Sequence, residues 1–433
     1  MTVVRVVVLN YDGGDDVVRA VDALAATATT ATVEIVVVDN GSGDGSAEAV
    51  EAAHPDVEVL RTGANRGFGA NNDALGDLSG IDHVALVNND AFVEPGWLDP
   101  LIAALDADPR VGAAQAKILL EPRFVEIHLE TLATEHRHDP RRFGVELRGL
   151  RVDGEDRWAG AHLASGSLGP VLDGGVRVER TAPWAQLRVP LGPTATSAPA
   201  RAEVLVSSPE PKSVRLAGAD GAVEVDLGPE PRWVTVPLGG RPVDVINSAG
   251  GELLADGSAT DRGGLEIDRG QYDRAVDLDA WSGGAVLLDP AYLRDVGLFD
   301  ERFFLYYEDT DLSARGRARG WHYRFVPTSV VRHRHAASSG VASPVLRWHN
   351  ERNRLLYLTK NAPPGVAARA VVRHPLSTLS YARRDVVGPV LDHRPVDTAT
   401  VRLRLSAYAG YLRLAPAMLA ERRRQRSRPL RRQ

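Results

Sequence analysis

Short apolar runs alternate with helical patterns over about the first 115 residues, and this alternation constrains the fold more than any other feature. The apolar runs are nearly continuous and rich in valine, as is typical of parallel strands whose two faces are both covered by helices. The alternation predicts a parallel, doubly wound α/β sheet with right-handed crossovers. We expect strands at residues 3–9, 34–38, 57–60 and 84–87, and helices at residues 15–26, 46–53, 70–78 and 96–105.

Each expected strand is followed by polar or glycine-rich residues, and these strand ends share one edge of the sheet. In open α/β sheets, ligands bind at that edge, and glycines let the backbone approach a ligand closely. Asp90, directly after the fourth strand, is well placed to hold a metal or a substrate; the alternative is a plain turn residue. The strand-end residues include Asn10, Tyr11, Asp39, Asn40, Asn65, Gly67, Asn71, Asn88, Asn89 and Asp90. The chain has no G-x-G-x-x-G after its first strand and no P-loop, so both of those phosphate cradles are missing.

Residues 123–242 have a different texture, with short alternating runs separated by turns rich in Pro, Gly, Ser and Asp. Spaced short strands of this kind predict a β-sandwich or barrel. We therefore expect an inserted, β-sandwich-like domain. Carbohydrate binding, scaffolding between domains and oligomerisation all remain open as its role.

The α/β pattern resumes near residue 243 and continues to about residue 343. A polar loop at residues 247–273 leads to a strand near residues 284–288, a helix at 290–296 and a helix ending near 318. We expect strands at 323–326 and 330–333. The sequence thus predicts a split α/β domain at residues 1–122 and 243–343, and a helical, basic region at residues 344–433. That last region is either a packed subdomain with a solvated arginine tail or a basic amphipathic surface for anionic membranes.

The composition is that of a globular protein, with 44% hydrophobic residues, 25% charged residues and a net charge of −6. The mild charge disfavours nucleic acid as the main partner. The absence of cysteine excludes disulfides and thiolate metal sites and fits a reducing compartment. Because no apolar run is long enough to cross a bilayer, we expect a cytoplasmic protein with peripheral membrane contact left open.

Taken together, these motifs resemble the family 2 inverting glycosyltransferases of the GT-A fold, particularly their rhamnosyltransferase-like bacterial branch. The resemblance covers about half the chain and leaves out the β insertion and the far C-terminus. It rests on residues 8–11, 38–42, 65–69, 86–90, 282–285, 299–304, 308–311, His333 and 353–354.

The resemblance implies roles for particular residues. Asp90 would ligate a divalent cation, Mg²⁺ or Mn²⁺, that bridges the donor diphosphate, and His333 would complete the metal site, with His335 as an alternative. Asn88 replaces the first acid of the usual Asp-x-Asp motif and so leaves fewer negative charges around the metal. Asp309, next to Glu308, matches the catalytic base, although acids at a helix start also favour the helix itself. Asp39 would contact the base of the nucleotide. The remaining donor-binding residues would be Asn10, Tyr11, Asn40, Asn65, Gly67, Asn71, Asn89, Gly283 and Gly284.

The chemistry of these residue types agrees with that reading, because a metal held by oxygen and imidazole ligands can neutralise a departing diphosphate, and a carboxylate can take the acceptor proton. The predicted function is transfer of a sugar from a nucleotide-diphosphate donor to a hydroxyl of a surface glycan or a lipid-linked acceptor. A homo-oligomer is left open. A sugar nucleotidyltransferase is the alternative enzyme, disfavoured because its basic glycine-rich signature is missing after the first strand. A non-catalytic carbohydrate-binding scaffold is the third hypothesis.

Overall fold

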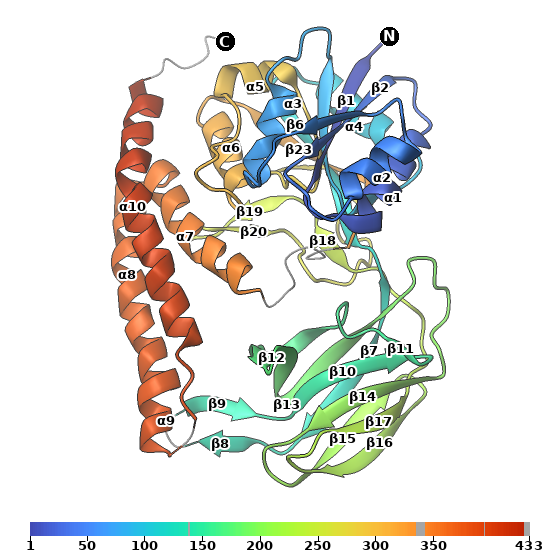
Figure 1. Cartoon of the computed structure of the whole chain (residues 1–433), viewed down its shortest axis with the longest axis vertical. Coiled ribbons are helices and arrows are strands. Elements are labelled where there is room, and N and C mark those ends of the chain that lie inside the picture. The colour runs from blue at the N-terminus through green and yellow to red at the C-terminus, as the bar shows by residue number, and fades with distance from the viewer. Residues whose placement is uncertain (137–138, 335–342, 394, 428–433) are drawn as a thin grey trace.

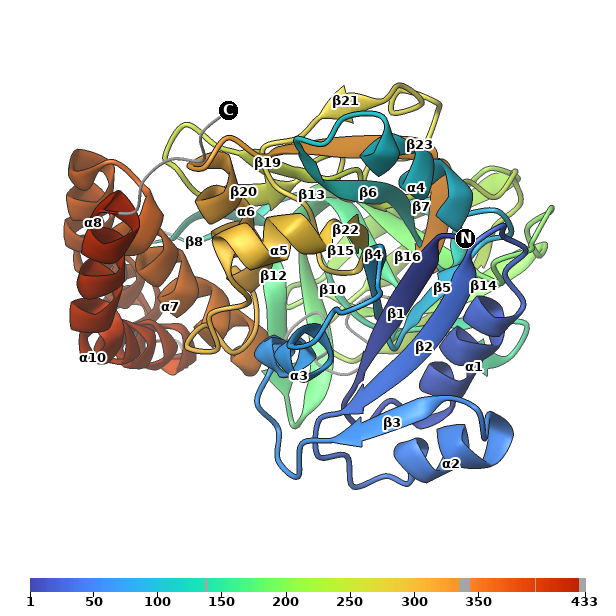
Figure 2. The ribbon, with the colours of Figure 1, turned by 90° about the horizontal axis from the view of Figure 1, so that it is seen from above.

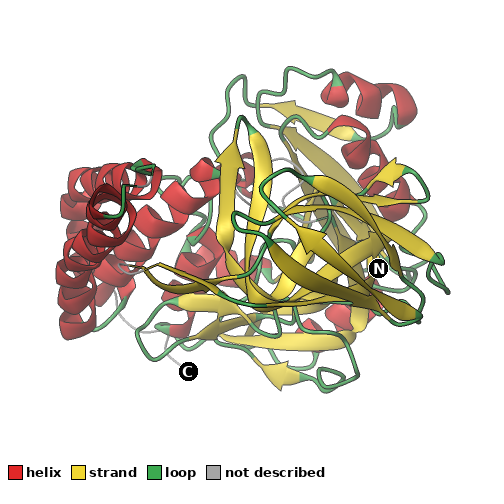
Figure 3. Ribbon diagram, turned by 90° about the horizontal axis from the view of Figure 1, so that it is seen from below, coloured by secondary structure: helices red, strands yellow, loops and turns green. Residues whose placement is uncertain are grey.

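The computed structural model describes residues 1–136, 139–334, 343–393 and 395–427. In Figure 1 an α/β unit lies above a β-rich unit, and the C-terminal helices form a column along one side that reaches from one unit to the other. Figure 3 shows the same division by secondary structure, with strands across most of the molecule and long helices gathered at one side. The candidate site belongs to the α/β unit.

The α/β unit is built on a ten-stranded sheet, which confirms the predicted α/β class. Strand β18 (Ile246–Ser248) pairs with β6, and β5 (Ala91–Val93) pairs with β23. The main path runs β21 (Val276–Asp277), β23 (His322–His333), β6 (Val111–Leu120), β22 (Ala285–Leu288), β4 (His83–Asn88), β1 (Val3–Asn10), β2 (Thr32–Asp39) and β3 (Glu58–Arg61).

Strands β1 to β4 are parallel, as the alternation predicts. The sheet as a whole is mixed, however, because β22 runs antiparallel to both β4 and β6. The reason lies at the end of β4, where the Asn88 N–H donates to the Gly284 carbonyl at 3.1 Å. The chain thus enters β22 at the edge where β4 ends, and the turn before β22 becomes part of that edge.

Two apolar cores cover the two faces of this sheet, and successive residues of β1 belong to opposite cores: Val6 and Val8 to one, Val7 to the other. Helices α1 (Gly14–Ala25), α2 (Ser46–Ala53) and α4 (Leu98–Asp106) pack on one face. Helices α3 (Asn72–Leu75), α5 (Pro290–Val296) and α6 (Glu308–Arg317) pack on the other. Burial on both faces explains the near-continuous apolar runs of the sequence.

Three local expectations need correction. The helix expected at residues 70–78 is only a 3₁₀ turn (Phe68–Asn71) followed by α3. The backbone hydrogen bond from Phe68 to Phe304 fixes the start of this segment, and Gly76, a poor helix former, follows its end. The strands expected at 323–326 and 330–333 are one strand, β23, with a register shift between Val326 and Val330. The polar loop at 247–273 contains β18 and the hairpin β19 (Gly251–Leu253) and β20 (Ala259–Asp261).

The β-rich unit is one nine-stranded sheet around a single valine- and leucine-rich core. The two ends of its path, β16 and β17, contact each other, so the sheet curls around that core. The path is β16 (Gly221–Leu227), β15 (Lys212–Gly218), β7 (Arg123–Thr131), β13 (Val176–Leu191), β10 (Glu146–Val152), β14 (Arg201–Ser207) and β17 (Arg232–Pro237). Strands β11 (Glu155–Asp156) and β12 (His162–Asp173) join at its side, and β8 (Thr134–His136) pairs with β9 (Asp139–Phe143).

The chain leaves the α/β sheet after β6 and returns to it at β18. The outgoing and returning segments run side by side, because Phe124 and Val243 exchange backbone hydrogen bonds of 2.9 and 2.8 Å. We propose domain boundaries at this crossing, near residues 122 and 243. Because its two ends lie side by side, the inserted unit does not interrupt the α/β sheet.

The C-terminal region is helical. It comprises α7 (Pro344–Asn361), α8 (Pro364–Ala382), a π-helical turn (Arg383–Val387), α9 (Gly388–Leu391) and α10 (Ala399–Ser427). Leu355 and Leu358 of α7 pack with Tyr411 and Met418 of α10, and Phe303 of the α/β unit joins the same core. Among the helices that the structure describes, none has the length and apolar character needed to cross a bilayer.

Candidate active site

A cavity of about 370 Å³ opens at the carboxyl edge of the parallel strands. Its walls come from the ends of β1, β2 and β4, from the turn before β22, and from the segment leading into α6, so both halves of the interrupted α/β unit contribute. Of the residues predicted from the sequence, the lining includes Tyr11, Asn40, Asn65, Gly67, Asn89, Asp90, Gly283, Gly284, Glu308, Asp309 and His333.

Asp90 and His333 meet in one corner of this cavity, although they are far apart in the sequence. The Nε2 atom of His333 lies 2.9 Å from Oδ1 of Asp90, and Nδ1 lies 2.8 Å from Oδ1 of Asn247. Asn88 reaches the same imidazole at 3.3 Å. Burial lowers the pKa of His333, but the carboxylates of Asp90 and Asp261 outweigh it and raise the pKa overall. His335 lies outside the described residues.

The geometry of His333 fits a metal ligand. Histidines that bind metals commonly donate their second ring N–H to a carbonyl or carboxylate, as Nδ1 can do here toward Asn247. Asp90 supplies a hard carboxylate oxygen, which suits Mg²⁺ or Mn²⁺. Among the described residues, no group of three or more His, Cys, Asp or Glu side chains is placed to hold a metal. A cation in this corner would therefore need further oxygen ligands from a bound diphosphate and water.

Glu308 and Asp309, at the start of α6, line the same cavity. Asp309 Oδ2 accepts the N–H of Gly283 at 3.1 Å, and Oδ1 accepts the N–H of Thr310 at 2.6 Å and its hydroxyl at 3.2 Å. These bonds fix the orientation of a half-buried carboxylate. A side chain at position 283 would collide with Phe68, since its Cβ would lie 2.5 Å from the ring, so this approach of backbone to carboxylate requires glycine.

The two neighbouring carboxyl groups differ in how readily they ionise. Burial raises the pKa of Asp309, and the hydrogen bonds from Gly283 and Thr310 oppose this only in part. Burial raises the pKa of Glu308 well above its ordinary value, and the charge of Asp309 adds to that effect. Among the described residues, none donates a hydrogen bond to the buried Oε2 of Glu308. When one proton is shared in this pair, Glu308 therefore holds it and the hydrogen-bonded Asp309 is the ionised carboxylate.

The segment before α6 has a strained backbone. Phe304, Tyr306 and Tyr307 all have positive φ, at 68°, 67° and 73°, which costs side chains of this size about 1–3 kcal/mol each. Buried Asn353 of α7 holds this segment, because its Nδ2 donates to the carbonyls of Phe303, Leu305 and Tyr306 at 2.7–2.8 Å. Asn353 thereby positions the approach to Glu308 and Asp309.

Gly67 lets the donor-side loop reach the strained segment. The Phe68 N–H donates to the Phe304 carbonyl at 2.6 Å, and a Cβ on Gly67 would lie 2.0 Å from that same oxygen. Its φ of +70° also favours glycine. The loop after β3 and the segment before α6 therefore contact each other directly at the lining of the cavity.

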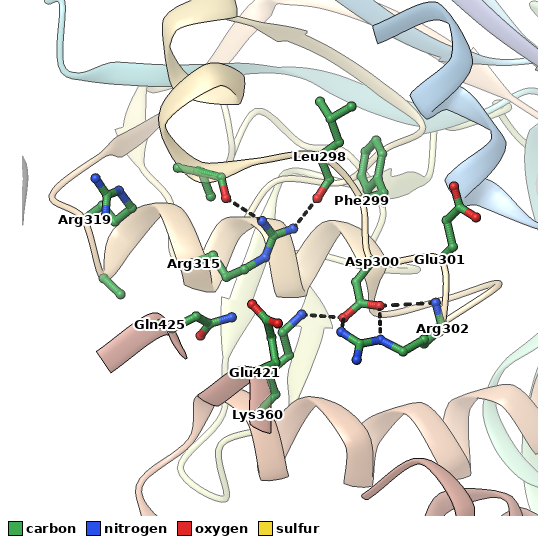
Figure 4. Close-up of a pocket in the computed structure, with 12 residues that line it drawn as sticks. Leu298, Phe299, Asp300, Glu301, Arg302, Arg315, Arg319, Lys360, Glu421 and Gln425 are labelled. Carbon is green, nitrogen blue, oxygen red and sulfur yellow. Dashed lines mark hydrogen bonds and ion pairs between the residues drawn. The ribbon is translucent and has the colours of Figure 1, made fainter. Parts of the chain in front are cut away.

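A second cluster of charges lies between α6 and α7. Buried Lys360 of α7 donates to Asp300 at 2.6 Å and to Asp311 at 2.8 Å, and Arg315 donates to Asp311 at 2.9 Å. Figure 4 shows Lys360 and Arg302 converging on Asp300 beside a cavity of about 410 Å³, with Arg315 turned toward the Leu298 carbonyl. Burial opposes ionisation of Asp300 and Asp311, but the cations prevail and lower the pKa of both carboxyls. These paired charges join α7 to the α/β unit.

Three residues predicted to bind the donor lie behind the cavity wall instead of lining it. Asn10 is fully buried, donates to Ser46 at 2.8 Å and accepts from Asn89 at 3.1 Å. Asp39 accepts the N–H of Ser42 at 3.2 Å, and buried Asn71 donates to the Phe68 carbonyl at 2.9 Å. In this structure these side chains shape the strand-end loops.

Other lining residues were not predicted from the sequence: Asn247, Thr260, Asp261 and Asn350. Asp261 lines the cavity and is exposed. Desolvation by the surrounding protein and the charge of Asp309 nevertheless raise the pKa of its carboxyl to about 6, although a hydrogen bond with Ser248 and the charge of His333 act to lower it. A polar stretch such as 247–273 offers many equivalent side chains. The pairing of β18 with β6 and of β19 with β20 positions Asn247, Thr260 and Asp261, whereas Asn350 comes from α7.

The comparisons with known proteins agree with this architecture. A family model described as glycosyl transferase family 2 matches residues 5–152. An N-acetylglucosaminyl-diphospho-decaprenol L-rhamnosyltransferase of Mycobacterium tuberculosis, found in two strains, is 34% identical over 122 residues, which is 26% of this chain. The chain spans 39% of the length of these curated relatives.

Two solved structures share a weaker likeness, which carries no conclusion about ligands. GalNAc-T7 with UDP, GalNAc and Mn²⁺ gives a TM-score of 0.46 at 11% identity, covering 97% of this chain and 57% of that one. The mannosyltransferase PcManGT from Pyrobaculum calidifontis with GDP-Man and Mn²⁺ gives 0.40 at 12% identity, covering 98% and 84%. The sequence match carries this comparison: residues 5–152 are similar to the family 2 glycosyltransferases.

Proposed function

We propose that this protein is an inverting glycosyltransferase that moves a sugar from a nucleotide-diphosphate donor to a hydroxyl of a glycan or lipid-linked acceptor. One observation carries the proposal: the Asp90–His333 pair and the Asp309 carboxylate line the same cavity. A site for the donor diphosphate and a base for the acceptor are the two parts that a single displacement needs.

The donor side of the cavity would be the edge formed by Tyr11, Asn40, Asn65 and Asn89. Asn40 donates to Asn65 at 3.1 Å and accepts the Arg66 N–H at 2.8 Å, so this edge is already ordered by its own hydrogen bonds. Asn10, Asp39 and Asn71 support these loops from behind. A preordered edge lowers the entropic cost of binding a nucleotide.

Asp90 and His333 would hold a divalent cation next to the diphosphate. The cation supplies charge neutralisation to the leaving phosphate oxygens when it is bound. Asn247 fixes the imidazole orientation through Nδ1, and Asn88 contributes an uncharged amide where the family commonly has an acid.

Asp309 would act as the base. The acceptor hydroxyl oxygen attacks the anomeric carbon, the bond from that carbon to the diphosphate oxygen breaks, and its electron pair leaves with the diphosphate. Asp309 takes the hydroxyl proton, and its raised pKa makes it a stronger base than an ordinary aspartate. Gly283 and Thr310 hold the carboxylate in place for this transfer.

The partial match to a rhamnosyltransferase indicates which substrates to test first. That relative is described as acting on N-acetylglucosaminyl-diphospho-decaprenol. We therefore propose a deoxyhexosyl donor and a polyprenyl-diphosphate-linked sugar as the first pair. Phe304, Tyr306 and Tyr307 lie at the cavity beside the base and offer apolar faces for such an acceptor.

A thermal-shift screen of nucleoside diphosphates and their sugars, with and without Mn²⁺, tests the proposal. Ligand at about 100 times its Kd should stabilise the folded protein by about 2.7 kcal/mol. Hits are then assayed for release of nucleoside diphosphate in the presence of acceptor. The proposal fails if no nucleotide sugar raises the melting temperature, or if a bound donor is never turned over with any hydroxyl acceptor.

A further inference from the structure

The charge of the chain is divided sharply along its length. Residues 344–433 contain 19 Lys and Arg against 5 Asp and Glu, whereas residues 1–343 contain 32 against 52. The sequence of α8 has no acidic residue, and that of α10 has one, Glu421. The helical column is therefore strongly basic beside an acidic remainder.

Helices α8 and α9 expose an apolar stripe as well. The buried face of α8 is formed by Ala367, Ala370, His374 and Thr378. On the faces turned to solvent, six large aliphatic side chains are between 49% and 67% exposed: Val372, Leu376, Leu379, Val387, Val390 and Leu391. Spacings of three and four residues place Val372, Leu376 and Leu379 on one stripe of α8. Val387 of the π-helical turn and Val390 and Leu391 of α9 follow along the chain.

The two exposed features coincide. Arg369, Arg373 and Arg383 are exposed on the same outward-facing segment as the apolar stripe. On α10, Leu405, Leu412 and Leu419 are 47–56% exposed at intervals of seven residues, and Arg402 and Arg413 are exposed beside them. Leucines with arginines and almost no acids are the composition of helices that lie on anionic bilayers.

The position of these helices suits such contact. Figure 2 shows α8 and α10 at the outer edge of the molecule, with α7 between them and the α/β unit. The core shared by α7 and α10 faces inward, so the exposed stripes are not needed to hold the column together.

We propose that the outer face of α8 and α9, extended by α10, binds the surface of an anionic phospholipid bilayer. The leucines and valines enter the headgroup boundary, and the arginines pair with lipid phosphates. A second copy of this chain is a poorer occupant because its arginines would meet like charges across the interface. Nucleic acid would leave the aliphatic stripe without a partner. This binding goes beyond the proposed transfer reaction and does not depend on it.

Vesicle co-sedimentation of the full chain tests the proposal, with vesicles of phosphatidylcholine alone and with an equimolar admixture of phosphatidylglycerol. We expect binding to the mixed vesicles and little to phosphatidylcholine. Raising the salt from about 0.1 M to about 1 M shortens the Debye length from about 10 Å to about 3 Å and should reduce the binding.

Two double variants separate the apolar and the basic contributions: Leu376→Asp with Leu379→Asp, and Arg369→Glu with Arg373→Glu. Each should lower the partition coefficient about tenfold or more, since one basic residue near the surface accounts for about fivefold. Leu132→Asp is the matched control, because Leu132 is 79% exposed on the β-rich unit, and it should bind like the parent chain. Unchanged melting curves establish that the variants fold.

The proposal is overturned if the parent chain ignores phosphatidylglycerol, or if both double variants sediment with vesicles as well as Leu132→Asp does. It is also overturned if sedimentation velocity shows a dimer that Leu376→Asp with Leu379→Asp dissociates, since the stripe would then be a protein interface. Neither result bears on sugar transfer, which is assayed with a soluble acceptor.

Discussion

The first turn of α6 carries carboxylates of two opposite kinds. Glu308 and Asp309 face the cavity, make no ion pair within the described part of the chain, and have raised pKa values. Asp311, two residues later, faces α7, and Lys360 of α7 and Arg315 of α6 together lower its pKa. The four residues Glu308–Asp311 thus divide between two environments, one open to a ligand and one closed by cations.

The difference separates carboxylates that line a cavity without an ion pair in the described chain from one that joins two helices. A buried carboxylate that is fully paired joins elements together but has little tendency to take a proton. A carboxylate held by hydrogen bonds without a cation keeps its basicity at a cost in stability. Substitutions that change one environment and leave the other intact test this difference.

Lys360→Met should have the largest effect on stability. It leaves Asp300 and Asp311 buried without their shared ammonium group, and losing one partner of a buried pair typically costs about 3–5 kcal/mol. Urea unfolding followed by circular dichroism measures the change.

Lys117→Met is the matched control. Lys117 is also buried and also bridges two aspartates, Asp268 and Asp273, but the side chain of Asp273 is 63% exposed and can be rehydrated. We expect a clearly smaller loss. Equal losses for the two lysine variants would show that the network behind α6 has no special structural weight.

Asn353→Ala should destabilise the protein by about 1–3 kcal/mol, because three carbonyls of the strained segment lose a buried donor. Turnover should fall further than stability explains, because the segment positions the proposed base. Asn361→Ala is the control, since Asn361 donates to Asp311 on the α7 side. It should weaken folding with kcat retained; a matching loss of kcat in both variants would contradict the division of α6.

Glu308→Gln should change the pH dependence of stability. Its effect on the free energy of unfolding should be smaller than that of the substitutions above. The folded-state pKa of Glu308 is raised, so its contribution to stability is complete below the unfolded pKa and is lost as the pH rises through the folded pKa. Glutamine cannot ionise. The melting temperature of the variant should therefore fall less than that of the parent between about pH 5 and about pH 8. Equal changes of melting temperature with pH in parent and variant across this range would show that Glu308 is not held protonated by burial.

Much of the site could be predicted from the sequence because parallel strands bring their carboxyl ends to one edge. That rule places Asn40, Asn89 and Asp90 together without any knowledge of the fold's second half. It cannot separate Asp309 from Asp311, since both favour a helix start and only the packing of α7 distinguishes them. Nor does it find Asn247 or Asp261, whose positions depend on the pairing of β18 with β6 and of β19 with β20. The strand at β22 was predicted, but its antiparallel direction was missed because an apolar run carries no direction.

The central claim is that Asp309 is the base of a donor site assembled from both halves of the α/β unit. The most direct test measures Mn²⁺-dependent nucleotide binding by titration calorimetry and single-turnover transfer for Asp309→Asn, with Asp90→Ala beside it. We predict that Asp309→Asn retains binding and loses about 10²–10⁴-fold in rate, whereas Asp90→Ala loses the metal-dependent part of binding. Transfer by Asp309→Asn at the parent rate, with donor bound, would contradict the account.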